Sequence, residues 1–129
     1  MIVGIGHDIV ENSRIKKLLD LYGDKFAAKI LSTKELPIFM QHKSQANYLA
    51  KRFAAKEAFA KACNTGLRDP VLLKNISILN DNLGKPIFVF SENLQQWLNS
   101  QNISKYHISL SDEKYLSSAF VILETNHCF

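Results

Sequence analysis

The chain begins with a run in which polar and apolar side chains alternate. Residues 2–10 follow the two-residue period of a strand, with Gly4, Gly6 and Asp8 on one face and apolar side chains on the other. Two glycines beside a carboxylate predict open space around it, where a ligand can approach the backbone closely. The alternative is an Asp that only forms a turn at the end of the strand.

Apolar residues then recur at helical spacing through the first half of the chain. The first helix has Asn12 or Ser13 as a candidate cap and Gly23 as its stop signal. The helices expected in this half cover residues 12–22, 26–31 and 44–63, and a further one opens at the capping-box sequence of residues 32–35.

The second half changes to short apolar runs separated by turn residues, a pattern typical of antiparallel strands. The elements expected there are strands at 76–79, 87–90, 106–111 and 116–123, and a helix at 92–99. Together the two halves predict one α+β domain over residues 1–129, with a mainly antiparallel sheet packed against the long helix.

The helix expected at 44–63 is apolar nearly all round, yet it contains Lys56, Glu57 and Lys61. An all-round apolar helix is a buried helix, and an unpaired buried charge is costly, so these groups should end at a cleft or interface. One carboxylate flanked by two ammonium groups suggests a site for a metal ion and a phosphate. The alternative is that Glu57 and Lys61 form an ordinary i,i+4 surface pair.

Composition narrows the possible partners only in part. The net charge of +4 is consistent with an anionic partner, whether nucleic acid, a phosphorylated small molecule or an acidic protein. The N-terminus has no basic leader, and no run reaches the ~18 apolar residues of a membrane span. The only cysteines, Cys63 and Cys128, are placed so that we expect no disulfide between them and a cytoplasmic location.

Five short segments add a more specific pattern. They are Gly4–Val10 with Arg14, Lys51–Ala58 with Lys61, Thr65–Gly66, Asn82–Pro86 and His107–Asp112. In this order and spacing, from Met1 to about Glu124, the chain resembles the holo-acyl-carrier-protein synthases, the small type of 4′-phosphopantetheinyl transferase.

The resemblance implies the fold of that superfamily and a magnesium-dependent enzyme. Such an enzyme transfers the 4′-phosphopantetheine arm of coenzyme A to a serine of apo acyl carrier protein and releases adenosine 3′,5′-bisphosphate. The holo carrier protein then supports fatty acid biosynthesis.

By this resemblance Asp8, Glu57 and Lys61 form the catalytic centre. Asp8 and Glu57 would be ligands of Mg²⁺, which takes one or two carboxylates together with substrate phosphates and waters. Lys61, one turn beyond Glu57, would reach the phosphates as a point charge. The base that removes the serine proton is either Glu57 or a metal-bound water, and the sequence leaves both open.

The resemblance also gives residues that bind coenzyme A. They are Lys51, Arg52, Lys61, Thr65, Gly66, Gly84, Lys85, Pro86, His107 and Ser109. Lys51 and Arg52 suit the 3′-phosphate, although a solvated basic face would have the same sequence. His107 and Ser109 share one face of a strand, where an isolated His is more often a structural residue.

Carrier proteins are acidic, and in this family they dock on the helix that follows the metal-binding strand. Here Arg14, Lys17 and Lys25 are the candidates, and Arg14 can make bidentate contacts with a carboxylate. The alternative is again a solvated basic face. The resemblance further implies a homotrimer with coenzyme A sites between neighbouring subunits.

Two other functions compete with this one. A nucleic-acid-binding module fits the charge, but the basic residues are scattered and the aromatic-and-glycine signature of an RNA-binding sheet is missing. A regulator that binds coenzyme A without catalysis would be favoured if Asp8, Glu57 or Lys61 were absent, and all three are present. We therefore expect a transferase that binds neither nucleic acid nor membrane.

Overall fold

The computed structural model describes residues 1–126, and its elements follow the alternation of patterns in the sequence. They are β1 (Ile2–Glu11), α1 (Asn12–Tyr22), α2 (Asp24–Ile30), α3 (Leu36–Met40), α4 (Gln45–Ala62), the 3₁₀ turn η1 (Leu73–Asn75), β2 (Ile76–Asn80), β3 (Pro86–Phe90), α5 (Glu92–Ser100), β4 (Lys105–Asp112) and β5 (Leu116–Glu124).

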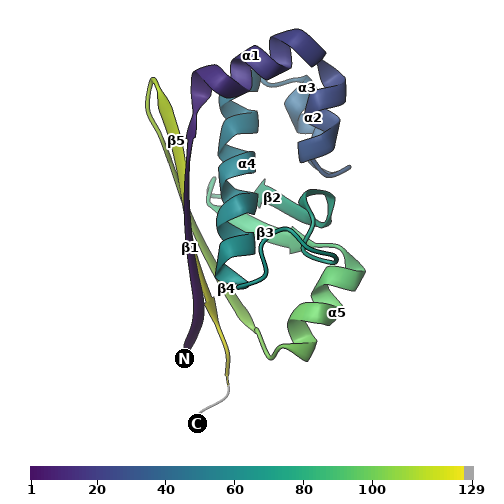
Figure 1. Ribbon diagram of the computed structural model, residues 1–129, viewed down its shortest axis with the longest axis vertical. Helices are drawn as coiled ribbons and strands as arrows, with labels where there is room; N and C mark the ends of the chain where they lie inside the picture. The colour runs from purple at the N-terminus through teal and green to yellow at the C-terminus, as the bar shows by residue number, and fades with distance from the viewer. Residues whose placement is uncertain (127–129) are drawn as a thin grey trace.

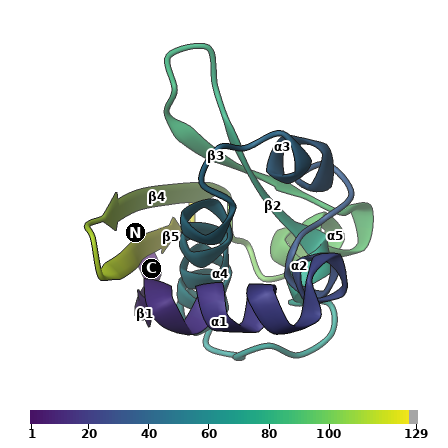
Figure 2. The same ribbon diagram turned by 90° about the horizontal axis from the view of Figure 1, so that it is seen from above.

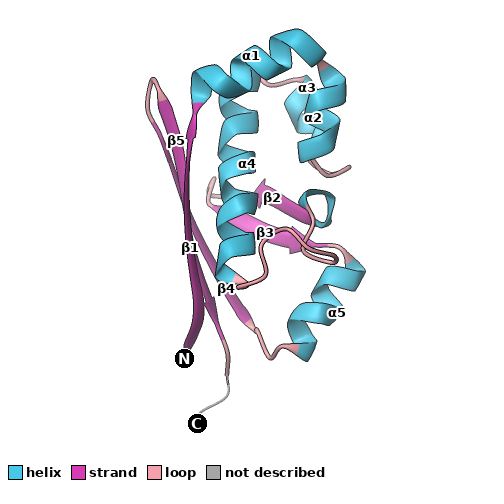
Figure 3. Cartoon of the chain, in the orientation of Figure 1, coloured by secondary structure: helices cyan, strands magenta, loops and turns pink. Residues whose placement is uncertain are grey.

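A long three-stranded sheet lies on one side of α4, and the smaller elements lie on the other (Figures 1 and 3). Its strand order is β1-β5-β4 and both pairs are antiparallel, whereas β2 and β3 form a separate antiparallel hairpin. The predicted α+β class, with an antiparallel sheet packed on a long helix, is confirmed. Except for α3, which begins later than the predicted capping box, the predicted bounds of the elements differ from the observed ones by at most two residues.

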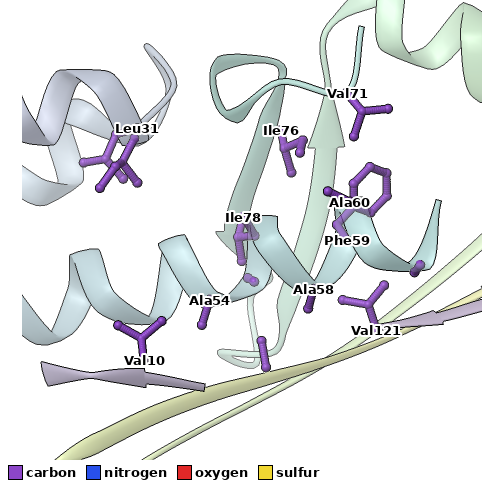
Figure 4. Packing of buried hydrophobic residues seen from close by; sticks show 14 of the residues in the cluster. Val10, Leu31, Ala54, Ala58, Phe59, Ala60, Val71, Ile76, Ile78 and Val121 are labelled. Carbon is purple, nitrogen blue, oxygen red and sulfur yellow. The ribbon is translucent and has the colours of Figure 1, made fainter. Parts of the chain in front are cut away.

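Helix α4 is buried along most of its length, as its composition predicts. Ala54 and Ala58 point toward the sheet, and Phe59 points toward the β2–β3 side (Figure 4). The small alanine side chains let the strands approach the helix closely, while Phe59 fills the wider space on the opposite side.

The two glycines of β1 pack directly against α4. A Cβ atom at Gly6 would overlap the carbonyl oxygen of Ala58, and one at Gly4 would overlap that of Ala62. The space beside these glycines is therefore filled by the helix backbone, and the expectation that a ligand approaches there is wrong. The glycines instead bring β1, and with it Asp8, close to α4.

The start of α1 differs from the prediction. Asn12 is the first helical residue and its side chain is buried, so neither Asn12 nor Ser13 caps the helix. Asn12 Nδ2 donates to the carbonyl oxygens of Glu113 (2.9 Å) and Lys114 (3.3 Å). Its amide therefore ties the β1–α1 junction to the distant β4–β5 turn, because the backbone groups there need buried partners.

Only one of the two hydrogen bonds of the predicted capping box at residues 32–35 forms. Glu35 Oε1 accepts a hydrogen bond from the Ser32 backbone N–H at 2.9 Å, as in a capping box, but the Ser32 hydroxyl bonds to the Ser77 hydroxyl at 2.6 Å. Helix α3 begins only at Leu36. Glu35 itself is fully buried, which a surface capping residue would not be.

The face of the long sheet that points away from α4 is apolar and exposed. Its exposed apolar side chains include Val3, Ile5, Ile9, Leu116 and Phe120, and the side chain of Ile5 is 61% exposed. Within residues 1–126 no helix is both long and apolar enough to cross a bilayer. Cys63 is a free, buried thiol, while Cys128 lies outside the described residues, so the predicted absence of a disulfide between them stays a prediction.

Candidate active site

A cavity of about 590 Å³ opens between β1, α1, α2 and α4. Its polar lining includes Asp8, Arg14, Lys29 and Glu57, and its apolar walls include Phe26, Ile30, Phe53 and Leu73. Asp8 comes from the strand and Glu57 from the helix that the two glycines hold against each other. The fold thus brings two predicted metal ligands and one predicted docking residue to a single hollow.

Lys61 contacts the strand that contains Asp8. Its Nζ donates to Asp8 Oδ1 at 3.1 Å and to the carbonyl oxygen of His7 at 3.0 Å. The Lys61 side chain is 54% exposed and that of Asp8 only 19%, so the ammonium group remains open to a ligand from outside. Within residues 1–126 Lys61 forms its ion pair with Asp8, and the simple i,i+4 pair with Glu57 is not formed.

The pKa of the Glu57 carboxyl lies above that of an ordinary glutamate. Partial burial raises the pKa of its carboxyl, and the neighbouring charge of Asp8 raises it further, while Lys61 opposes both effects. Two carboxylates that repel each other across one hollow are what a bound cation would stabilise.

The oxygen ligands present fit Mg²⁺ only with help from a substrate. Among residues 1–126 no group of three or more His, Cys, Asp and Glu side chains gathers at one point. Asp8 and Glu57 therefore have no third such side chain at the same point in the described part of the chain, although Glu11 also lines the cavity. Mg²⁺ characteristically fills its remaining positions with phosphate oxygens and waters.

Lys56 lies away from the cavity opening, although the sequence suggested that it flanks Glu57 at a ligand site. Its side chain is fully buried and pairs with Glu35, with Nζ 2.6 Å from Oε1. Burial lowers the pKa of Lys56, and Glu35 partly offsets this effect. Its ammonium group is thus occupied by the protein and not available to a phosphate.

A second hollow, of about 340 Å³, gathers predicted coenzyme-binding residues from three segments. Lys51 and Arg52 of α4, Gly84 and Pro86 of the β2–β3 turn, and Ser109 of β4 all line it. The hairpin turn is ordered, since Asp81 Oδ1 accepts hydrogen bonds from two of its backbone N–H groups.

Arg52 is unusual in this second hollow. The residue is only 5% exposed, and its guanidinium stacks 4.1 Å above the ring centre of Tyr48. Its buried Nε finds no hydrogen-bond partner within residues 1–126. A buried donor without a partner is costly, and an anion in the hollow would relieve that cost.

Other predicted coenzyme-binding residues lie outside both hollows. The Thr65 hydroxyl donates to the Gly66 carbonyl oxygen at 2.8 Å just after α4, and the Lys85 backbone N–H supports the hairpin turn. His107 lies on the exposed sheet face, with Nε2 2.6 Å from Glu124 Oε2, and this hydrogen bond lowers the pKa of Glu124.

The two hollows share no lining residue and lie on different sides of α4. Figure 2 shows α1, beside the first hollow, and the β2–β3 turn, beside the second, on opposite sides of the helix. A single chain therefore does not bring all the predicted coenzyme-binding residues to one place.

Comparison with known proteins now identifies the family. Residues 4–118 match the model of the 4′-phosphopantetheinyl transferase superfamily. The chain belongs to this superfamily. It is an enzyme of the holo-[acyl-carrier-protein] synthase type, as the relatives show. The holo-[acyl-carrier-protein] synthase of Nitrosomonas europaea is 48% identical over 124 residues, which cover 96% of this chain and 99% of the relative.

Solved structures of such synthases share the fold. The crystal structure from Neisseria meningitidis has a TM-score of 0.94 at 50% identity, covering 97% of this chain and 100% of that one. The Bacillus anthracis synthase, solved in complex with CoA (3′,5′-ADP), has a TM-score of 0.82 at 38% identity, covering 98% and 99%.

A third hollow, an apolar groove, adjoins the first cavity of the transferase. This groove of about 370 Å³ is lined by Leu18, Tyr22, Lys25, Phe26 and Lys29. Leu18, Phe26 and Lys29 also line the cavity that contains Asp8 and Glu57. Of the predicted docking residues, Arg14 and Lys25 line these hollows, whereas Lys17 is exposed outside them.

Some residues around the site could not have been found from the sequence. Phe26, Ile30 and Leu73 form apolar walls, and in the sequence they look like any other core residues. Glu35 pairs with Lys56 across 21 positions, and no local pattern connects the two. Periodicity indicates which side chains are buried but not which distant partner they meet.

Proposed function

We propose that this transferase moves the 4′-phosphopantetheine arm of coenzyme A to a serine of an apo acyl carrier protein. The observation that most supports this is the convergence of Asp8, Glu57 and Arg14 on one cavity, with the Lys61 ammonium at Asp8. The two carboxylates suit a metal ion, the Lys61 ammonium group suits a phosphate, and the Arg14 guanidinium suits an acidic partner. The proposal treats the chain as one working domain over residues 1–129.

In the reaction the serine Oγ forms a bond to the phosphorus next to pantetheine. The P–O bond to adenosine 3′,5′-bisphosphate breaks, and the serine proton passes to a base. Glu57 is the candidate base among the protein's own groups, because its raised pKa makes the carboxylate a stronger proton acceptor. Lys61 neutralises phosphate charge once a ligand draws it from Asp8.

Asp8 and Glu57 are proposed to hold Mg²⁺, because both line one cavity and the charge of Asp8 raises the pKa of Glu57. When bound, such an ion neutralises charge on the pyrophosphate and favours departure of the bisphosphate.

The carrier protein is proposed to dock along α1 and α2. Arg14 lines the cavity itself, Lys25 and Lys29 line the adjoining groove, and Lys17 adds charge nearby. Basic side chains at the rim of an apolar groove suit an acidic partner, since rim charges mainly speed association and set its salt dependence.

The nucleotide end of coenzyme A is proposed to bind in the second hollow. Lys51 and the unpartnered Nε of Arg52 would contact the 3′-phosphate, beside Gly84, Lys85, Pro86 and Ser109. Because that hollow lies on the far side of α4, we propose that one coenzyme A spans two subunits. Thr65, Gly66 and His107 would then complete the site from either subunit.

The exposed face of the long sheet is the proposed contact between copies. Ile5, Ile9 and Phe120 lie on it, and a patch of that kind marks an interaction surface. The family resemblance gives a homotrimer as the assembly. It also places the enzyme in the cytoplasm, where holo carrier protein serves fatty acid synthesis.

The test is incubation with coenzyme A, Mg²⁺ and an apo carrier protein, followed by mass spectrometry. We expect the carrier to gain the mass of one phosphopantetheine arm, and we expect Asp8→Ala and Glu57→Ala to remove most of that activity. Glu92→Ala, which changes an exposed carboxylate on α5, is the matched control. A carrier of unchanged mass with the unmodified enzyme would refute the proposed function.

Three further measurements separate the parts of the proposal. Arg14→Glu should raise KM for carrier protein and flatten its salt dependence, while coenzyme A binding stays nearly unchanged. Phe120→Glu should dissociate the oligomer and weaken coenzyme A binding. Light scattering that gives a monomer mass together with full activity would overturn the shared site.

A further inference from the structure

Lys56 uses its whole hydrogen-bonding capacity inside the protein. Its Nζ donates to Glu35 Oε1 at 2.6 Å, to the carbonyl oxygen of Ile30 at 2.7 Å and to that of Leu73 at 3.0 Å. An ammonium group has three protons, so each one has its own acceptor. Both side chains of the ion pair are 0% exposed.

Glu35 extends the same network to further segments. Its Oε1 also accepts from the Ser32 backbone N–H at 2.9 Å, and its Oε2 accepts from the Ile78 backbone N–H at 2.8 Å. The pair therefore links α4 to the end of α2, the loop before α3, η1 and β2. Outside this network the Tyr48 hydroxyl of α4 donates to the Glu35 carbonyl oxygen at 3.4 Å, and the apolar packing around α4 has no preferred direction.

The two carbonyl groups held by Lys56 belong to the wall of the active-site cavity. Ile30 and Leu73 both line it, and Lys29 of the same α2 turn lines it too. Glu57, the next residue after Lys56, lines the cavity from the helix side. Glu57 thus lines the cavity from α4, while its neighbour Lys56 bonds to the residues of the opposite wall.

We propose that Lys56 is a positioning residue for phosphopantetheine transfer. Its ammonium group holds the α2 and η1 wall in place, and Glu35 holds the ammonium group. This inference rests on the proposed function, because it takes the cavity as the place where carrier serine and coenzyme meet. The wall includes the turn of α2 with Lys29 and adjoins the groove proposed for carrier docking, so a displaced wall would misplace the carrier serine.

The experiment compares Lys56→Met, the double variant Lys56→Met/Glu35→Gln and the control Leu98→Ala. The single variant leaves a buried charge unpaired, so the double variant removes both charges while keeping an amide oxygen as an acceptor for a backbone N–H. Leu98 is a fully buried residue of α5 outside the cavity, and its truncation destabilises the protein without touching the wall.

In the folded double variant we expect kcat to fall about tenfold or more, because small displacements at a reacting centre have large effects on the rate. The KM for coenzyme A should stay within about twofold of the wild-type value, since the nucleotide hollow is untouched. Hydrogen–deuterium exchange in residues 26–36 should be faster than in wild type. Leu98→Ala should leave kcat and that exchange unchanged at a temperature where it is folded.

A folded double variant with kcat within about twofold of wild type would overturn the positioning role. Unchanged exchange in residues 26–36 would overturn the anchoring on which it depends. A wild-type enzyme that fails to modify the carrier would instead refute the proposed function, and the exchange measurement would still decide whether Lys56 anchors the wall.

Discussion

Two lysines of α4 form ion pairs with carboxylates from other elements, and the two pairs have opposite surroundings. Lys56 and Glu35 lie 2.6 Å apart and are completely buried. Lys61 and Asp8 lie 3.1 Å apart at the edge of the candidate active-site cavity, and the lysine is half exposed. The first ammonium group has three protein acceptors, whereas the second lies where a phosphate can approach it.

The difference shows how one helix can serve both folding and chemistry. A buried pair is strongly coupled to the fold, because removing either partner leaves a charge without solvent or counter-ion. A pair at a cavity edge is weakly coupled to the fold and can exchange its partner for a ligand. The surface pair Lys16–Asp20 of α1, 3.0 Å apart, is the solvated reference for both lysines of α4.

The largest expected effect is on stability, in Lys56→Met. Loss of one partner from a buried, hydrogen-bonded ion pair costs about 3–5 kcal/mol of the free energy of unfolding. Lys16→Met, on the solvated face of α1, should change it by less than about 0.5 kcal/mol. Urea unfolding of both variants measures the difference. Equal losses would mean that the Lys56–Glu35 pair is not the anchor that its burial indicates.

This contrast also shows what the sequence predicted and where it stopped. The all-round apolar composition of residues 44–63 predicted a buried helix, and that is confirmed. The same pattern predicted that its charged groups end at a cleft or interface, which holds for Glu57 in the cavity but not for Lys56, which is enclosed by the protein. The sequence did not separate Lys56 from Lys61, because each partner comes from a segment distant in the chain. A helical period places residues on faces but does not say which face meets another element.

At residues 32–35 and at the glycines of β1, too, contacts with distant segments overrode what the local sequence predicted. The Ser-Thr-Lys-Glu order predicted a helix start at residues 32–35, but the Glu35 carboxylate also binds Lys56 and the Ile78 backbone N–H, and the helix begins only at Leu36. Gly4 and Gly6 predicted room for a ligand, and the structure fills it with the α4 backbone. The roles of the individual coenzyme-binding residues stay predictions, since Lys51 and Arg52 line a hollow that shares no residue with the cavity of Asp8 and Glu57.

The next effect concerns the packing that brings Asp8 to Lys61. In Gly6→Ala the new methyl group meets the Ala58 carbonyl oxygen, which is backbone and cannot rotate away. Overpacking of this kind costs about 1–3 kcal/mol, and β1 must move away from α4. We expect lower stability together with lower activity. A variant with wild-type melting temperature and turnover would show that the strand–helix spacing is not needed.

A smaller effect on the fold, but a large one on turnover, is expected for Lys61→Ala. A charge aimed at developing phosphate charge contributes about 2.7–4 kcal/mol to catalysis, so turnover should fall roughly a hundred- to a thousandfold. Stability should change by less than about 1 kcal/mol, because the pair with Asp8 is partly exposed. Steady-state kinetics and urea unfolding are measured on the same protein, with Lys16→Ala as the control. Loss of stability without loss of turnover would reverse the contrast between the two lysines.

The smallest effect, and the most specific, is a gain of stability in Glu57→Gln. Burial and the charge of Asp8 raise the pKa of Glu57 in the folded protein above its unfolded value, so ionised Glu57 disfavours the folded state. Below the unfolded pKa the group is protonated in both states and contributes nothing. As pH rises through the folded pKa the full penalty appears.

Glutamine keeps the shape of the protonated group at every pH, so the variant should be more stable than wild type at about pH 7 by less than about 1 kcal/mol. The two proteins should converge at about pH 4, near the ordinary pKa of a glutamate. Urea unfolding at both pH values, first with a chelator and then with Mg²⁺, measures this. In the presence of coenzyme A, which supplies phosphate oxygens, added Mg²⁺ should stabilise the wild type more than the variant, because a ligand stabilises only the folded form that binds it. If the variant is less stable than wild type at neutral pH without metal, then Asp8 and Glu57 do not oppose each other across the cavity, and the case for a shared cation is lost.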